Sequence, residues 1–167
     1  NNNGVLTINS STITNNVASS SGGGVYSRGS TAFLIQNSTI SLNSAIVGGG
    51  IWNKYSLLII SSSSISGNVA NTTGGGIMNN LSPNLTISSS SISGNVANVT
   101  GGGIYNRLSD NTTISNSFIS GNTSSNGGGG IYIAFCDNMA ISSTSISGNI
   151  SSNGGGIFNA ASNLTTI

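Results

Sequence analysis

Asp110 and Asp137 are the only acidic side chains in this 167-residue chain, which has no histidine. They are 27 residues apart. If the chain repeats with that period, the two carboxylates come within about 5 Å of each other on neighbouring turns. A pair at this separation suggests either a Ca²⁺ site or the two carboxylates of a retaining glycosidase.

The surroundings of this pair favour a simpler interpretation. Ca²⁺ takes about six to eight oxygen ligands, and the chain has no third carboxylate side chain. Arg107 lies three residues before Asp110, so we expect a surface ion pair of the kind that contributes little to stability, with Asp137 solvated. Cys136 is the single cysteine and is expected to be an ordinary small side chain. We therefore predict no catalytic residue, no metal site and no cofactor.

A sixfold repeat determines where these residues lie. A Gly-Gly-Gly block followed by Ile or Val recurs every 26 or 27 residues. The blocks begin at Gly22, Gly48, Gly74, Gly101, Gly128 and Gly154. In a second block, Ile precedes Asn by eight residues in all six copies, as at Ile87 and Asn95. A fixed period in this range is typical of a solenoid, and invariant spacing indicates strands held in register.

Each repeat predicts three short strands. Apolar and polar residues alternate with the two-residue period of a strand, as in Leu85-Thr86-Ile87. The remaining Ser, Thr, Asn and Gly residues are poor helix formers. The three strands are the Leu-Thr-Ile, Ser-Ile-Ser and Gly-Ile-aromatic-Asn segments. We predict an all-β, single-domain, right-handed parallel β-helix over residues 1–167, with about six turns of 26–27 residues.

The same periodicity predicts an apolar interior and a polar corner. Three columns of β-branched residues are expected inside, running from Ile8 to Ile167, from Ile13 to Ile146 and from Val25 to Ile157. A column of asparagines is expected at a corner of the coil as a structural ladder. Its members are Asn16, Asn43, Asn68, Asn95, Asn122 and Asn149.

An aromatic stripe follows the glycine blocks. The residue after each Gly-Gly-Gly-Ile or Gly-Gly-Gly-Val points outward, by the parity of a strand. These residues are Tyr26, Trp52, Met78, Tyr105, Tyr132 and Phe158. We interpret the stripe as a surface for a sugar or for lateral contact with a neighbouring rod. The alternative is that the rings stack on one another and cover the glycine backbone.

Composition limits the classes of partner. Three basic residues cannot neutralise a nucleic-acid backbone, so no nucleic acid is expected. No apolar run is long enough to span a membrane. Low net charge favours association. The Asn-x-Ser/Thr sequences at Asn71, Asn84, Asn98 and Asn111 are possible glycosylation sites, although sequons are little more frequent than chance predicts.

The two ends of the chain have corresponding sequences. Leu164-Thr165-Thr166-Ile167 repeats the pattern of Val5-Leu6-Thr7-Ile8. Solenoids normally need terminal caps, and unpaired strand edges are templates for further pairing. We therefore expect the chain to be a segment of a longer solenoid or fibre, or a subunit that associates head to tail.

The repeats resemble those of a known family. The run Gly-Gly-Gly-Ile-Tyr-Asn at 101–106 and Ser-Ile-Ser-Gly-Asn at 91–95 are similar to the Gly-Gly-Ala-Ile and Phe-x-x-Asn repeats of polymorphic outer-membrane autotransporter proteins. They also resemble pectate-lyase-like repeats of secreted adhesins. This chain has Ile92 where the Phe-x-x-Asn motif has Phe. The resemblance implies a cell-surface or extracellular location, adhesion or stalk roles, contact with host or neighbouring cells, and no catalytic residues.

The leading functional prediction is a non-enzymatic extracellular structural or adhesive β-solenoid. Two alternatives remain open. One is a polysaccharide lyase or hydrolase of pectate-lyase type that uses Asp110 and Asp137. The other is a carbohydrate-binding module that uses the aromatic stripe.

Overall fold

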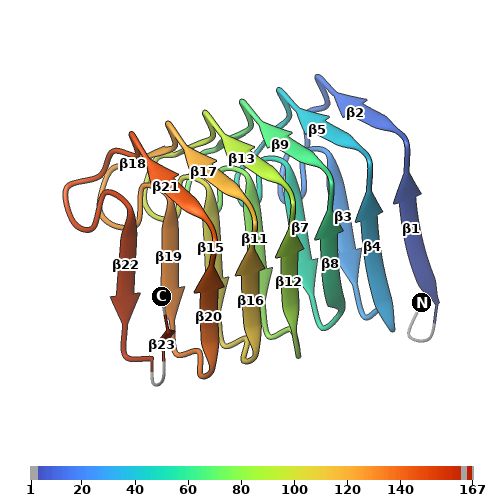
Figure 1. Cartoon of the computed structure of the whole chain (residues 1–167). Helices are drawn as coiled ribbons and strands as arrows, with labels where there is room; N and C mark the ends of the chain where they lie inside the picture. Colours follow the sequence, from blue (N-terminus) through green and yellow to red (C-terminus); the bar gives the residue numbers. More distant parts are fainter. Residues whose placement is uncertain (1–3, 163–164, 167) are drawn as a thin grey trace.

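The chain folds into a rod of stacked coils, and the computed structural model describes residues 4–162 together with 165 and 166. All pairings among its named strands are parallel, and neighbouring strands in each sheet belong to successive turns of the coil. Figure 1 shows the two ends of the chain at opposite ends of the rod. We call each turn a rung and number rungs 1 to 6 by their glycine blocks, from Gly22 to Gly154.

Four sheets run along the rod. Sheet I contains β1 (Val5–Asn9), β4 (Ala32–Gln36), β8 (Leu57–Ser61), β12 (Leu85–Ser88), β16 (Thr112–Ser115), β20 (Met139–Ser142) and β23 (Thr165–Thr166). Sheet II contains β2 (Thr12–Thr14), β5 (Thr39–Ser41), β9 (Ser64–Ser66), β13 (Ser91–Ser93), β17 (Phe118–Ser120) and β21 (Ser145–Ser147). Sheet III contains β6 (Ser44–Ala45), β10 (Val69–Ala70), β14 (Val96–Ala97) and β18 (Thr123–Ser124). Sheet IV contains β3 (Val25–Arg28), β7 (Ile51–Lys54), β11 (Ile77–Asn80), β15 (Ile104–Arg107), β19 (Ile131–Ala134) and β22 (Ile157–Ala160).

The parallel β-solenoid predicted from the repeat is confirmed, but three strands per turn is one too few for the middle rungs. Sheet III adds a two-residue strand directly after the corner asparagine. Its inward residue is small, as at Ala45, Ala70 and Ala97. Two residues are too short to show the alternation by which strands are recognised in a sequence.

The three predicted apolar columns form the core. Ile35 to Ile141, Ile40 to Ile119 and Val25 to Ile131 are buried in steps of one rung. The outer members Ile8, Ile13, Ile146 and Ile157 are partly buried and pack against the core from the two ends. Ile167, predicted to extend the first column, and Leu164 lie outside the described residues. The buried columns agree with the parity predicted for the strands, except that Met78 of β11, predicted to face outward, is also buried.

The structure contains a fourth interior column of side chains that the repeat pattern did not predict. Strands of sheet I also bury the residue two positions before their Ile, and these residues pair along the sheet. They are Phe33, Leu58, Leu85, Thr112 and Met139. Because the column mixes aromatic, aliphatic and polar side chains, no single residue type reveals it.

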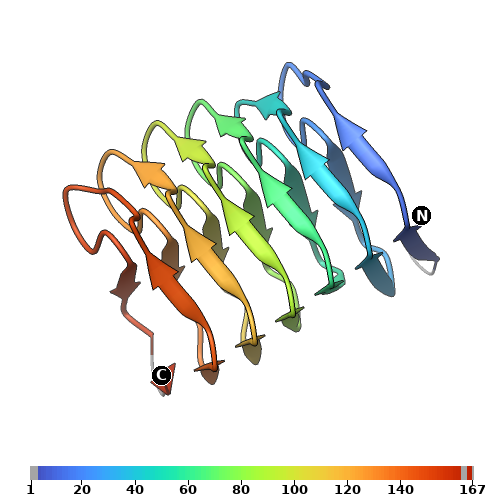
Figure 2. The ribbon, with the colours of Figure 1, turned by 45° about the horizontal axis from the view of Figure 1, so that its top comes forward.

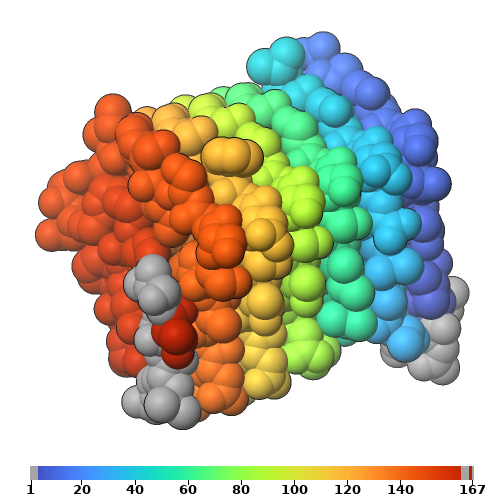
Figure 3. Space-filling view, in the orientation of Figure 1, coloured from blue at the N-terminus to red at the C-terminus, as the bar shows by residue number. Residues whose placement is uncertain are grey.

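The glycine block is required by close packing between rungs. Gly74, the first of its block, has φ +68°, which favours glycine. A Cβ on Gly76 would lie 2.6 Å from the carbonyl oxygen of Gly103 and 3.0 Å from the side chain of Asn95. The block therefore brings the backbones of successive rungs together beside the asparagine column. Figures 2 and 3 show the rungs as successive bands along the rod.

Candidate functional site

An unbroken asparagine ladder runs inside one corner of the rod. The Asn95 Oδ1 accepts hydrogen bonds from the backbone N–H and the Nδ2 of Asn68, both at 2.9 Å. The Asn95 Nδ2 donates to the carbonyl oxygen of Ile65 at 2.9 Å and to the Oδ1 of Asn122 at 3.0 Å. The same pattern repeats from Asn16 to Asn149. Each interior member is thus satisfied by the rung before it and the rung after it.

This ladder has a direction. At every step the earlier rung donates its N–H and Nδ2, and the later rung accepts with its Oδ1. Asn16 is exposed at the first position, where no earlier rung among the described residues donates to its Oδ1. Asn149 is partly buried at the last position, where its N–H finds no later ladder oxygen among the described residues. The acceptor end and the donor end of the ladder therefore match each other chemically.

A second, shorter ladder lies under sheet IV. Asn53 donates from Nδ2 to the Oδ1 of Asn79, and Asn79 donates to the Oδ1 of Asn106, both at 2.8 Å. Ser27 and Ile133 occupy the same register position on either side and interrupt it. The Asn53 Oδ1 is buried and accepts no hydrogen bond from the described residues. This interruption leaves the first oxygen of the short ladder unsatisfied.

Cys136 lies beside Asn106, the last asparagine of the short ladder. The Asn106 Nδ2 lies 3.4 Å from the Cys136 Sγ and donates to the Thr112 Oγ1 at 2.9 Å. Burial raises the pKa of the Cys136 thiol, opposed by backbone hydrogen bonds from Ser109. The cysteine is therefore a buried, protonated part of the corner, without the lowered pKa of a reactive thiol.

The aromatic stripe forms two stacks of rings. Tyr26 and Trp52 stack with centroids 4.5 Å apart and planes 8° apart. Tyr105 and Tyr132 stack at 4.9 Å and 4°, and Phe158 continues this stack at 5.0 Å. The side chain of Met78 is buried between the two stacks.

The stacking limits what this stripe can bind. Ring faces inside a stack cover one another, so their edges rather than their faces are turned toward solvent. A sugar binds to the face of an aromatic ring. Burial, together with the neighbouring Tyr132, raises the pKa of Tyr105, so its hydroxyl remains neutral. The arrangement matches the alternative in which the rings stack on one another along the glycine backbone.

Asp110 and Asp137 are joined by a hydrogen bond between the Asp110 side chain and the Asp137 backbone. The N–H of Asp137 donates to the Asp110 Oδ1 at 2.8 Å. Among residues 4–162 and 165–166, no group of three or more His, Cys, Asp or Glu side chains is placed to hold a metal ion. One Asp110 oxygen thus stabilises the turn of the next rung, which is a structural role for a carboxylate at this position.

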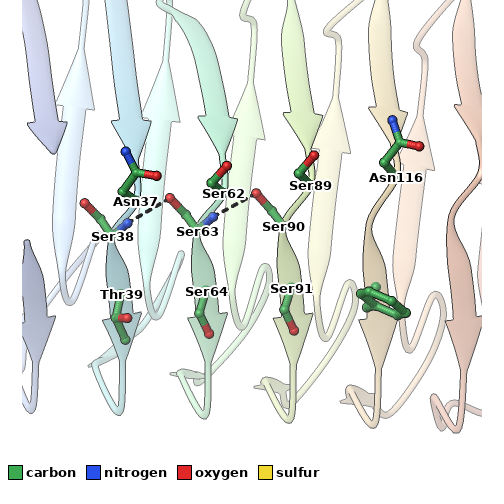
Figure 4. Close-up of a pocket in the computed structure, with 11 residues that line it drawn as sticks. Asn37, Ser38, Thr39, Ser62, Ser63, Ser64, Ser89, Ser90, Ser91 and Asn116 are labelled. Atoms are coloured by element: carbon green, nitrogen blue, oxygen red, sulfur yellow. Dashed lines mark hydrogen bonds between the residues drawn. The ribbon is translucent and has the colours of Figure 1, made fainter. Parts of the chain in front are cut away.

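A ladder of serine side chains, which residue spacing did not predict, links successive rungs at the turn between sheets I and II. The N–H of Ser38 donates to the Oγ of Ser63, and Ser63 donates in the same way to Ser90, both at 3.1 Å (Figure 4). Each hydroxyl in turn donates to a carbonyl oxygen two residues earlier. Because serine is abundant all along the chain, these positions do not stand out in the sequence.

The serine ladder lies along a shallow groove between sheets I and II. The groove has a volume of about 720 Å³ and is lined by Ser, Thr and Asn side chains, with the exposed ring of Phe118 at one end. It can exchange hydrogen bonds with a polar ligand. The chain has no histidine that could activate one of these hydroxyls.

The predicted glycosylation positions differ in accessibility. Asn71, Asn98 and Asn111 are exposed, whereas Asn84 is partly buried. The sequon at Asn122 belongs to the buried ladder. Exposure alone leaves the occupancy of these sites a prediction.

Comparisons with known proteins point to one kind of repeat. Residues 10–28, 89–107 and 116–134 match the family model of the Chlamydia polymorphic membrane protein repeat. These three segments are similar to the repeats of that family. Each matched segment runs from a turn before sheet II to the end of a sheet IV strand, and includes one ladder asparagine and one glycine block. No curated protein and no solved structure gave a significant match. The described residues contain no helix of the length and hydropathy needed to cross a membrane.

Proposed function

We propose that the chain is a non-enzymatic structural or adhesive β-solenoid, displayed at the cell surface, whose rods stack end to end into a fibre or stalk. The polymorphic membrane protein repeats support a surface location. A surface of Ser, Thr and Asn with only 3% charged residues supports association. Host or neighbouring cells are the proposed targets of adhesion.

The observation that carries this proposal is the direction of the asparagine ladder. The last rung offers the N–H and Nδ2 of Asn149, and the first rung offers the Oδ1 of Asn16. Stacking the last rung of one rod on the first rung of the next joins donor to acceptor. Stacking two first rungs joins acceptor to acceptor, so the ladder favours head-to-tail order.

The apolar columns support the same order. Ile8 and Ile13 are partly buried at one end, and Ile146 and Ile157 are partly buried at the other. A head-to-tail junction buries these side chains and pairs β21 and β22 with β2 and β3 of the next chain. In sheet I, β1 of the next chain takes the place of β23 beside β20. Such a contact is heterologous and does not close, so it generates an open filament.

The junction is tested by Asn16→Leu, with Asn15→Leu as the matched control. Asn16 is exposed, so its loss affects the junction more than the rod. Asn15 is also exposed and has φ 58°, and Leu42 has φ 55° at the same position one rung later. Light scattering and negative-stain microscopy should show filaments for the parent chain and for Asn15→Leu, but short rods for Asn16→Leu. Equal filament growth by both variants, or no filaments from the parent chain, would overturn end-to-end assembly.

The absence of catalysis is tested separately. We expect no turnover of polygalacturonate or of neutral polysaccharides, because only two carboxylates are present and one oxygen of Asp110 binds the backbone. Asp110→Asn and Asp137→Asn serve as controls. Turnover that either substitution abolishes would establish an enzyme in place of a structural protein.

A further inference from the structure

All three basic residues of the chain lie in one column on the outward face of sheet IV. Arg28 pairs in register with Lys54, and the column continues through Asn80 to Arg107. Arg28 and Lys54, which we call the cation pair, therefore stand side by side on neighbouring rungs, with backbones about 4.8 Å apart. Like charges directly opposite each other destabilise a sheet. An anion that lies between the two side chains removes this repulsion.

The two acidic residues of the chain lie away from the cation pair. Asp110 belongs to the turn after rung 4, and Asp137 belongs to the turn after rung 5. Asp110 is thus two rungs, or about 10 Å, beyond Lys54. This separation exceeds the screening length of about 8 Å at physiological ionic strength. The positive charge of the cation pair is therefore available to a ligand.

The two side chains of the cation pair have different surroundings. The Lys54 Nζ lies 4.9 Å from the centroid of the Tyr55 ring and 5.9 Å from that of Trp52. Such contacts orient an ammonium group without neutralising it. Arg28 is exposed, and the residue after it is Gly29, which places no side chain at the turn. The same left-handed position carries a bulky residue in rungs 2 to 5, namely Tyr55, Leu81, Leu108 and Phe135.

We propose that the cation pair binds a carboxylate of an acidic polysaccharide. The planar guanidinium of Arg28 matches both oxygens of a carboxylate, and the Lys54 ammonium adds a point charge beside it. The nearby surface is uncharged and offers hydroxyl groups. Tyr26 lies on the same face of sheet IV and Thr31 lies in the following turn, and both are exposed. Their hydroxyls can exchange hydrogen bonds with the sugars on either side of the acidic group.

The spacing of charge favours a polysaccharide over a nucleic acid. Each strand of a nucleic acid duplex carries a phosphate about every 3.4 Å. Beyond Lys54 the column continues with the neutral Asn80, and Arg107 lies three rungs, or about 14 Å, from Arg28. Most phosphates along this column would remain unneutralised. A polysaccharide that alternates an acidic sugar with a neutral one spaces its carboxylates further apart, and its neutral sugars suit the uncharged positions.

This inference rests on the proposed adhesive role, because it names the chemistry of the target, but it needs only rungs 1 and 2 of a single rod. One cation pair should bind weakly, with a dissociation constant of about 1 mM. In an end-to-end filament the pair recurs every six rungs, or about 29 Å. A long polysaccharide then contacts several pairs at once and is held more tightly.

Tryptophan fluorescence tests the site in the Asn16→Leu background, where end-to-end growth is blocked. Trp52 is the only tryptophan and lies beside Lys54, so its emission should change as a ligand binds. The probe is a hyaluronan oligosaccharide, which alternates a uronate with a neutral sugar. The control is the same oligosaccharide with its carboxyl groups reduced to alcohols. We expect saturable binding of the acidic form that weakens as salt is added, and no binding of the reduced form. Equal binding of both forms, or of neither, would overturn the proposal.

Matched variants separate the cation pair from the overall charge of the rod. Arg28→Gln and Lys54→Gln should each weaken hyaluronan binding about tenfold, because each removes one charge-assisted contact. Arg107→Gln removes the same charge from the same column, but beside Asp110, and should weaken binding less than about twofold. All three side chains face outward, so the variants should melt as the parent does. Equal losses in the three variants would indicate non-specific attraction and contradict the proposed site.

A nucleic acid probe tests the choice of ligand. A single-stranded DNA oligonucleotide of matched length should bind more weakly than the hyaluronan oligosaccharide at the same ionic strength. Tighter binding of the DNA would overturn the assignment of a polysaccharide. Filament growth is measured separately by microscopy, so failure of glycan binding leaves end-to-end assembly unaffected.

Discussion

The two asparagine ladders use the same side chain in two different ways. The corner ladder runs unbroken from Asn16 to Asn149, and each interior member makes hydrogen bonds to both neighbouring rungs. The ladder under sheet IV has three members and leaves the Asn53 Oδ1 without a donor among the described residues. One ladder spans the rod, whereas the other is confined to its middle.

The difference lies in what each asparagine bonds besides its neighbours in the ladder. In the corner ladder the Nδ2 also satisfies a carbonyl oxygen of the second apolar column, such as Ile65 or Ile92. Ladder and core are thereby joined at every rung. In the short ladder Ile133 replaces asparagine and remains buried. An apolar residue such as Ile133 can occupy a position of the short ladder, because fewer backbone groups there need a side-chain amide as hydrogen-bond partner.

The largest predicted effect comes from the core that supports the corner ladder. Ile92→Asp places a charge inside the rod without a partner, beside the carbonyl oxygen that Asn122 binds. We expect the adjacent rungs to unfold, so circular dichroism should lose the cooperative transition. Ser93→Asp, one residue later on the outward face, should melt close to the parent chain. A soluble Ile92→Asp rod with unchanged melting would contradict the core described above.

The next effect distinguishes the two ladders directly. Asn95→Leu leaves the N–H of Asn68 and the carbonyl oxygen of Ile65 without these partners. We expect a loss of at least about 3 kcal/mol in the free energy of unfolding, since each buried orphan group costs about 1–3 kcal/mol. Urea denaturation measures this loss, with the exposed Asn98→Ala as control.

The short ladder should be less sensitive. In Asn79→Ile the Asn53 Nδ2 keeps the Ser56 carbonyl and the Ser82 Oγ, so mainly the Asn106 oxygen loses a donor. We expect a loss of about 1–2 kcal/mol. If urea denaturation gave a cost equal to that of Asn95→Leu, the two ladders would be energetically equivalent and the comparison would fail.

The smallest effect concerns Cys136, at the end of the short ladder. Its raised pKa means that the unfolded chain loses the thiol proton at a lower pH than the folded chain. This contribution to stability is therefore present below about pH 8.5 and is lost as pH rises through the folded pKa. Between pH 8 and 10 the melting temperature of Cys136→Ser should fall slightly less than that of the parent chain. A steeper fall for Cys136→Ser would contradict burial as the cause.

Sequence alone predicts the parts of this rod that repeat one residue type. The period of the glycine blocks indicates the coil, and the invariant step from Ile87 to Asn95 places a core column beside a ladder. The fourth column from Phe33 to Met139 and the serine ladder at Ser63 could not be predicted in this way. The first varies in residue type, and the second is hidden among many similar residues.

The candidate sites were harder to predict, because they depend on side-chain direction. Outward parity placed Tyr105 and Tyr132 correctly in one stripe, but parity does not tell whether rings offer faces or stack. Spacing brought Asp110 and Asp137 to neighbouring rungs, but the bond to the Asp137 N–H depends on the local turn. Left-handed backbone at Leu81 or Phe135 has no sequence signal, because neither residue favours it.

Cryo-electron microscopy of the assembled chain tests most directly whether the corner ladder sets the direction of the rod. We expect filaments in which the rise of about 4.8 Å per rung continues through each junction. The N–H of Asn149 should then lie within hydrogen-bond distance of the Asn16 Oδ1 of the next chain. Filaments joined head to head, or with the ladder out of register at the junction, would contradict it.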